Sequence, residues 1–132
     1  MRASIASLAV AAIIALPAIG LPAAAQADGN TFIAAAYSKH NGTVGFAAAT
    51  SDADAKSKAI AECAKGASDC QIMIAGSSMC ISLARSADDK SLGLGGSDTR
   101  AGSQDEAMKE CAVDGAKGCN IHDTYCAPDS LK

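Results

Sequence analysis

The sequence predicts an α+β domain in which two similar repeats, each strand–strand–helix–strand, form an antiparallel sheet with two helices packed on one face. Three observations lead to this prediction: an apolar leader, an internal repeat, and six cysteines in a chain of only 132 residues. Hydrophobic residues make up 49% of the chain and charged residues 19%, which is too apolar for a disordered protein. The net charge of −3 argues against a general nucleic-acid binder, so no nucleic-acid partner is expected.

Residues 1–27 have the features of a secretory signal peptide. Arg2 is their single charge, an apolar stretch runs from Ile5 to Leu21, and small residues precede Ala27. We expect cleavage after Ala27, which leaves residues 28–132 as one domain without a membrane span. The alternative is an uncleaved membrane anchor, but one proline interrupts the apolar stretch and another follows it, which argues against a spanning helix. The expected location is therefore secreted, periplasmic or in the cell envelope.

The rest of the chain contains two copies of one pattern. A shift of 48 residues places Glu62-Cys63-Ala64 on Glu110-Cys111-Ala112, and one further residue places Cys70 on Cys119. Such aligned blocks are not easily produced by chance, even in an alanine-rich chain. We define repeat one as residues 32–79 and repeat two as residues 80–127.

Each repeat has the same expected order of elements. In repeat one these are a strand over Phe32–Tyr37, a hairpin turn at Asn41-Gly42, a return strand over Thr43–Ala49, a helix that begins at Ser51 or Asp52 and stops at Gly66, and a strand over Gln71–Ala75. In repeat two they are Cys80–Arg85, a turn at Asp88-Asp89-Lys90, a glycine-rich return over Leu92–Gly96, a helix with the capping box Ser103-x-x-Glu106 that stops at Gly115, and Asn120–Thr124.

The two helices have matching apolar faces at helical spacing. The residues expected on these faces are Ala55, Ala59, Ile60 and Cys63 in the first helix, and Ala107, Met108, Cys111 and Ala112 in the second.

Six cysteines in an exported chain predict disulfides rather than a metal or redox site. The sequence has no C-x-x-C motif, so zinc binding and thiol redox catalysis are not expected. Each repeat has one cysteine at the helix end and one shortly after it, while Cys80 and Cys126 have no counterpart and lie at the ends of repeat two. We therefore predict the pairs Cys63–Cys70, Cys111–Cys119 and Cys80–Cys126. A bond between the repeats, such as Cys63–Cys111, is the main alternative.

His122, Asp123 and Tyr125 form the cluster in the sequence that most resembles a catalytic site. With Ser77 or Ser78 as nucleophile, His122 and Asp123 resemble a general base and the group that orients it. Neighbouring residues of a strand point to opposite faces, however, so we do not expect His122 to face Asp123. We therefore assign no catalytic residue and treat the three residues as a possible surface site.

Local structure explains the other motifs. Asp52 and Asp54 lack the glycine and the glutamate that complete a calcium loop, and they fit helix capping instead. His40 lies at a predicted hairpin tip and has no identifiable partners for a metal. The glycine-rich segments lack the dinucleotide and phosphate-loop patterns, so we expect no cofactor and no metal site.

Taken together, these motifs resemble the secreted bacterial family named domain of unknown function 4189 (DUF4189). The resemblance rests on the Ala-x-x-x-Cys end of each helix, at Ala59 and Ala107, on the second cysteine after each, and on residues 33–38. It covers about residues 31–127 and implies a fold and an exported location but no catalytic residue. Val44 stands where members of the family often carry tryptophan, which implies that any aromatic surface at that place is reduced here.

These features favour an exported, disulfide-stabilised binding module whose partner is an unknown protein or envelope component. An inhibitor or immunity-type protein is a narrower alternative, and a weak hydrolase that uses His122 is another. A concave pocket that brings His122 to a serine or a carboxylate would favour the enzyme. An exposed, flat apolar patch would favour binding.

Overall fold

The structure, a computed structural model, describes residues 31–127, and the predicted signal peptide lies outside them. Within this range the chain forms strands and helices in the predicted order, twice strand–strand–helix–strand. The strands are β1 (Phe32–Tyr37), β2 (Val44–Ala49), β3 (Gln71–Ser77), β4 (Cys80–Arg85), β5 (Leu92–Ser97) and β6 (Asn120–Cys126), and the helices are α1 (Asp52–Ala64) and α2 (Arg100–Ala112). No helix in this part of the chain is long and apolar enough to cross a bilayer.

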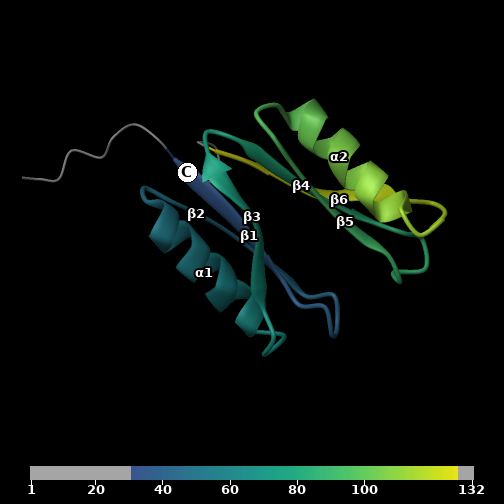
Figure 1. The fold of residues 1–132 in the computed structure, drawn as a ribbon, viewed down its shortest axis with the longest axis horizontal. Coiled ribbons are helices and arrows are strands. Elements are labelled where there is room, and N and C mark those ends of the chain that lie inside the picture. The colour runs from purple at the N-terminus through teal and green to yellow at the C-terminus, as the bar shows by residue number, and fades with distance from the viewer. Residues whose placement is uncertain (1–30, 128–132) are drawn as a thin grey trace, which may run out of the picture.

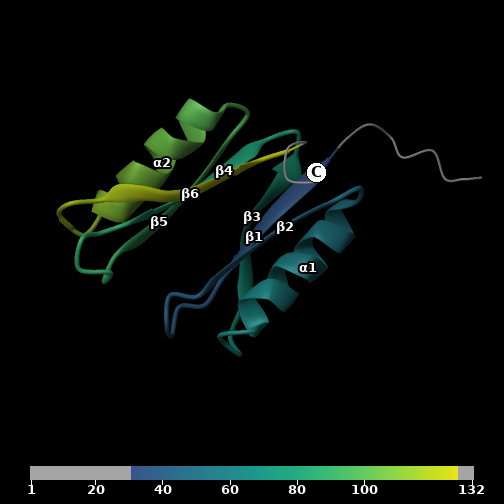
Figure 2. The same cartoon turned by 180° about the vertical axis from the view of Figure 1, so that it is seen from behind.

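The elements form four layers in the order helix–sheet–sheet–helix (Figure 1). One antiparallel sheet has the strand order β2-β1-β3 and the other has the order β5-β4-β6. Helix α1 covers the outer face of the first sheet and α2 covers the outer face of the second (Figure 2). The α+β class and the repeated order are confirmed. The sheet is divided into two, however, and the helices lie on opposite faces, because each repeat pairs its third strand with its own first strand.

The repeats agree in register as well as in strand order. The pairing of β1 with β3 shifts between Ala35 and Ala36, and the pairing of β4 with β6 shifts at the two equivalent residues. Each shift is a β-bulge that leaves one extra residue in the outer strand, Met73 in β3 and His122 in β6. The bulge therefore belongs to the shared fold, while the residue that occupies it differs between the repeats.

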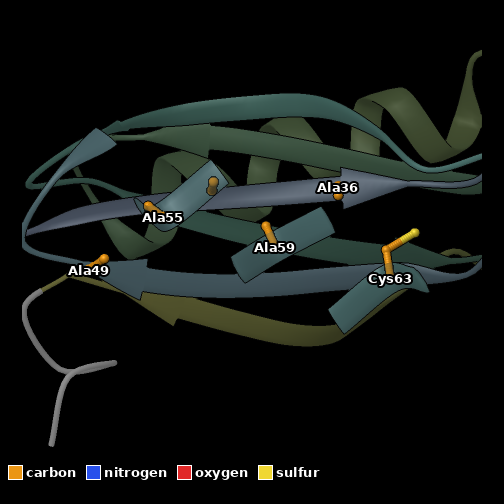
Figure 3. Close-up of a cluster of buried hydrophobic side chains, with 6 residues drawn as sticks. Ala36, Ala49, Ala55, Ala59 and Cys63 are labelled. Atoms are coloured by element: carbon orange, nitrogen blue, oxygen red, sulfur yellow. The ribbon is translucent and has the colours of Figure 1, made fainter. Parts of the chain in front are cut away.

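Alanine, glycine and cysteine line the contact between each helix and its sheet. A Cβ atom built on Gly45 would lie 2.3 Å from the carbonyl oxygen of Ala59, and one on Gly93 would lie 2.1 Å from that of Ala107. The helices thus approach the return strands so closely that only glycine fits, which explains part of the glycine-rich return in repeat two. The buried cluster under α1 consists of Ala34, Ala36, Ala49, Ala55, Ala59 and Cys63 (Figure 3).

Larger side chains fill the layer between the two sheets. Residues on the central strands alternate between this layer and the helix, as strand geometry requires, so β1 and β4 are buried on both faces. The buried members of the layer are Ile33, Ala35 and Ile81, and Phe46, Ile74, Met79 and Leu94 pack against them.

Three disulfides join the pairs expected from the repeat: Cys63–Cys70, Cys111–Cys119 and Cys80–Cys126. The first two tie the end of each helix to the segment that leads into the next strand. The third links two directly opposite residues of β4 and β6. No cysteine among the described residues is free.

Helix α2 begins earlier than the capping-box pattern predicts. Its N-cap is Thr99, whose hydroxyl accepts a hydrogen bond from the N–H of Gly102 at 3.1 Å. Ser103 instead lies inside the helix and is buried, with its hydroxyl oxygen 2.7 Å from that of Ser82. Ile60, expected on the apolar face of α1, is 40% exposed.

Candidate binding cleft

The two repeats enclose a pocket of about 290 Å³ where strands β2 and β6 lie beside each other. We call it the β2/β6 cleft. Repeat one contributes residues of β2 and α1 to the lining, and repeat two contributes residues of β4 and β6. The lining residues are Val44, Gly45, Phe46 and Glu62 from repeat one, and Leu83, Arg85, His122, Asp123 and Tyr125 from repeat two.

The β-bulge in β6 turns His122 toward its neighbour in the chain. His122 Nδ1 lies 3.0 Å from Asp123 Oδ2, and both side chains are substantially exposed. The expectation that these two residues point to opposite faces is wrong, because the bulge interrupts the regular alternation of side chains at this point. The imidazole and the carboxylate are therefore in contact with each other, and both residues line the cleft.

An aromatic pair links the two repeats at the cleft. The rings of Phe46 and Tyr125 stack with their centroids 4.6 Å apart and an angle of 27° between their planes. Tyr125 remains 38% exposed, so part of its ring is accessible to a ligand. Aromatic faces of this kind supply apolar contact area, while the tyrosine hydroxyl can form a hydrogen bond.

Charged side chains of both signs border the cleft. The guanidinium of Arg85 donates a hydrogen bond to the carbonyl oxygen of Gly42 at 3.1 Å, which ties the first hairpin to repeat two. Glu62 forms an ion pair with Lys65 on its own helix, at 2.6 Å. With Asp123, the cleft thus has two carboxylates and one permanent cation, together with the imidazole of His122.

The repeat supplies a comparison for this group of side chains. On the opposite edge, between β3 and β5, the same backbone positions have mostly apolar or small residues. There the counterparts of Arg85, His122, Asp123 and Tyr125 are Tyr37, Met73, Ile74 and Gly76. The fold therefore does not require polar residues at these positions, so their presence at the β2/β6 cleft needs another explanation.

Side chains fill the space at that opposite edge. A Cβ atom on Gly76 would lie 2.5 Å from the sulfur of Met79, and one on Gly96 would lie 2.7 Å from the methyl carbon of the same residue. The N–H of Ser78 donates to the carbonyl oxygen of Thr31, and the N–H of Ala127 donates to that of Met79, so the counterpart of Met79 before β1 is Thr31, which has a shorter side chain.

The serines considered as nucleophiles lie away from the cleft. Ser77 ends β3 and Ser78 follows it, with the N–H of Ser78 donating to the carbonyl oxygen of Thr31. Strands β3 and β6 are on different sheets, and neither serine lines the cleft. Among the residues that do line it, Tyr125 is the single hydroxyl, so the structure does not assemble a Ser-His-Asp arrangement there.

A second hollow lies at the tip of the first hairpin, where His40 and Asn41 face the segment from Gly66 to Asp69. The hydroxyl of Ser38 donates to the Asp69 carboxylate, and this bond lowers the pKa of Asp69. Of the Asn41-Gly42 pair, only Gly42 has a positive φ, and the Asn41 amide instead donates to the Gly66 carbonyl oxygen at 2.7 Å. These bonds hold the hairpin in place, and they account for the polar residues of this hollow.

No group of three or more histidine, cysteine or acidic side chains in residues 31–127 is arranged to hold an ion. The six cysteines are consumed by disulfides.

The fold and the cleft define a small, disulfide-bonded α+β module built from two similar halves. A family model described as Domain of unknown function (DUF4189) matches residues 32–126, and the chain belongs to this family. No curated protein and no solved structure matches the chain.

Proposed function

We propose that the chain is an exported binding module and that the β2/β6 cleft is its ligand-binding site. The observation that carries the proposal is the difference between two equivalent edges of the fold. One is packed with apolar side chains, while the other is open and has an aromatic pair, a His–Asp pair and Arg85. Export is proposed from the leader sequence and from the three disulfides, since disulfides persist mainly in oxidising compartments.

The size of the cleft favours recognition of part of a larger partner. Small-molecule sites usually have volumes of roughly 300–1,000 Å³, and this cleft, at about 290 Å³, is at or below the lower limit. It fits one or two side chains or a single ring. We therefore propose a protein or an envelope component as the partner. An inhibitor or immunity-type protein is one form of this function, in which the captured partner is a hydrolase or toxin.

The test replaces cleft residues by their counterparts in repeat one. His122→Met and Tyr125→Gly should leave the disulfides and the circular dichroism spectrum intact, because the fold accepts these residues at the equivalent positions. Both variants should lose a partner that the oxidised wild-type chain captures from envelope extract. Met73→His is the matched control, and it should retain that partner. Equal capture by the wild type and both cleft variants would show that the binding site lies elsewhere.

A hydrolytic enzyme is the second candidate, and the distance of 3.0 Å between His122 and Asp123 favours it. A histidine oriented by a carboxylate can act as a general base on water even without a serine nucleophile. In that case the oxidised chain hydrolyses a generic ester, and His122→Gln abolishes the activity. Absence of hydrolysis by the correctly oxidised wild type would remove this candidate.

A further inference from the structure

Strand β2 is an edge strand, so half of its backbone N–H and C=O groups are not paired with any other strand of residues 31–127. Antiparallel neighbours alternate between hydrogen-bonded and non-hydrogen-bonded pairs. The N–H of Ser38 donates to the carbonyl oxygen of Thr43, so the residues of β2 bonded to β1 follow from Thr43 in steps of two. The N–H and C=O groups of Val44, Phe46 and Ala48 therefore point away from β1, outward from the sheet edge.

The equivalent strand of repeat two shows the same geometry in a capped form. The N–H of Gly96, the counterpart of Ala48, donates to the carboxylate of Glu106 at 3.0 Å rather than to β4. In α1 the position equivalent to Glu106 is Lys58, which cannot accept a hydrogen bond. Within the described residues, the outward N–H of Ala48 thus lacks the acceptor that caps the other edge.

The remaining two edges are interrupted. Strands β3 and β6 each contain the bulge described above, and a bulge disrupts the straight ladder that an added strand needs. The register of β2 against β1 is unbroken over all six of its residues. Of the four sheet edges in residues 31–127, β2 is the one that is both regular and uncapped.

Two hollows follow one another along this same strand. The β2/β6 cleft begins beside Val44 and Gly45, and a smaller pocket of about 100 Å³ lies beside Ala47 and Ala48. Phe46 and Tyr125 line both. An edge strand with successive side-chain pockets is the arrangement by which proteins bind extended peptides, since the backbone supplies affinity and the pockets supply specificity.

Charge indicates the kind of segment that fits. The cleft lining has two carboxylates, Glu62 and Asp123, against one permanent cation, Arg85, and the exposed Glu62 carboxylate already has an ion-pair partner in Lys65. Glu62 is on α1 and Asp123 is on β6, so the two residues belong to opposite faces of β2. Alternate side chains of an added strand would point to these two sides. A second copy of this chain has a net charge of −3 and offers poor complementarity, whereas a basic segment offers good complementarity.

We propose that the β2/β6 cleft binds an extended, basic segment of a partner protein by strand addition to β2. The main chain of the segment pairs with Val44, Phe46 and Ala48, and its lysine or arginine side chains reach Glu62 and Asp123. This inference rests on the proposed function, because it names the class of ligand for the same cleft.

The test titrates the oxidised chain with a capped peptide of alternating lysine and valine, and a matched peptide of glutamate and valine. Amide hydrogen exchange is followed by NMR. With free lysine peptide at about ten times its Kd, exchange at Phe46 and Ala48 should slow about tenfold by mass action. Leu94, the counterpart of Phe46 on β5, should be unaffected. The glutamate peptide should protect none of them.

Three variants complete the experiment. Ala48→Pro removes an outward N–H without touching the pairs with β1, a place where an edge strand tolerates proline, and should abolish peptide binding. Glu62→Gln should weaken binding of the lysine peptide several-fold. Glu106→Gln, on the other edge, should leave binding unchanged. Because the exchange measurement uses the wild type, the proposal remains testable if Ala48→Pro does not fold.

The alternatives give distinct results. Peptide binding without protection of Phe46 and Ala48 overturns strand addition, and equal binding of both peptides overturns the basic class. Amide protection that is already present without peptide, and that increases with protein concentration, identifies a second copy of the chain as the occupant. This result also overturns the proposal. Failure of every peptide, while partner capture still depends on His122, overturns strand addition by a basic segment but leaves the proposed function standing.

Discussion

At the scale of single residues, each hairpin is held by a serine bonded to a carboxylate. In repeat one the buried Ser38 donates to Asp69, which follows α1 in the chain. In repeat two the equivalent Ser86 donates to Asp88 within its own hairpin, at 2.6 Å. The position equivalent to Asp69 is Gly118. The carboxylate that accepts the hydrogen bond of the hairpin serine thus comes from a different place in the sequence in each repeat.

These bonds predict the pH dependence of the hairpins. The Ser38 hydroxyl, and more weakly the N–H of His40, hold the pKa of Asp69 below its ordinary value of 3.8. The stabilisation is therefore present above pH 3.8 and is lost as the pH falls through the lower pKa of the folded state. In Ser38→Ala, the pKa of Asp69 should rise toward its ordinary value, measured by NMR titration of the carboxyl carbon.

Ser86 and Asp88 provide the control for this titration. Ser86 is the largest cause of the lowered pKa of Asp88. Ser86→Ala should therefore raise the pKa of Asp88 and leave that of Asp69 unchanged. A pKa of Asp69 that does not respond to loss of the Ser38 hydroxyl would contradict the assignment.

The sequence identifies some residues of the cleft and misses others for a definite reason. His122, Asp123 and Tyr125 are recognisable because they are adjacent and chemically distinctive. Their mutual geometry depends on a bulge that is set by pairing with β4, and no local pattern indicates it. Phe46 and Arg85 join them only through the packing of one sheet on the other, so their contribution requires the tertiary structure.

At the scale of elements, the distance between helix and strand is set by glycine. Gly45→Ala would force its Cβ against the backbone of both Ala59 and Cys63, at 2.3 Å from each, so α1 or β2 must move. We expect a loss of about 3 kcal/mol in the free energy of unfolding, at the upper end of overpacking costs. Denaturant unfolding measures it, and Gly93→Ala should cost a similar amount because its contacts are equivalent.

The variant Gly115→Ala separates the cost of steric overlap from the cost of backbone strain. Gly115 has a φ of +74 and no heavy atom within 4 Å of the Cβ position, so strain alone opposes alanine there. A cost of roughly 1 kcal/mol is expected for this variant. Equal costs at Gly45 and Gly115 would show that the helix can withdraw from β2 at little expense.

The disulfides differ in the length of chain that they close. Cys80 and Cys126 are 46 residues apart, while Cys63 and Cys70 are 7 apart. Loop entropy predicts that loss of the long bond costs about 4 kcal/mol and loss of the short one about 2.4 kcal/mol. Denaturant unfolding of Cys80→Ala/Cys126→Ala measures the larger value. A cost below about 1 kcal/mol would mean that the bond adds little to constrain the unfolded chain.

The elements themselves are largely predictable, because their signals are local and occur twice. Alternation, turn residues and the aligned cysteines place every strand within a few residues of its observed bounds. The start of α2 is the exception. Ser103 has the local pattern of a cap, but its hydroxyl takes part in a buried contact with Ser82 on β4, which depends on how the helix packs on the sheet.

At the scale of the whole molecule, each repeat lacks a partner for the inner face of its sheet. In repeat one this face includes Ile33, Ala35, Phe46 and Ile74, all of which are covered by repeat two. The local sequence predicts this apolar face but not which surface covers it. Because the local sequence does not indicate the covering surface, it predicts one continuous sheet, whereas the structure has two stacked sheets.

The exposed inner face predicts the behaviour of an isolated repeat. Residues 31–79 alone, with the bond Cys63–Cys70, should self-associate, because two copies can cover each other's inner faces as the two repeats do. Sedimentation over a range of concentrations measures this, with the oxidised full chain as the reference. A repeat that stays monomeric and protects its amides like the full chain would show that the inner layer is dispensable.

The close approach of each helix to its sheet limits which substitutions this protein can accept. Where Ala59 and Ala107 meet backbone, almost every mutation adds atoms, and the fully buried residues of these two clusters are all alanine or cysteine. Around Ile81 the neighbours are bigger and only partly covered, so one can contract as another grows. Under a saturation mutagenesis scan, we expect the outer layers to be nearly invariant and the middle layer to accept aliphatic exchanges. Changes in ligand specificity would then arise most readily from substitutions in the middle layer and at the edge of that layer.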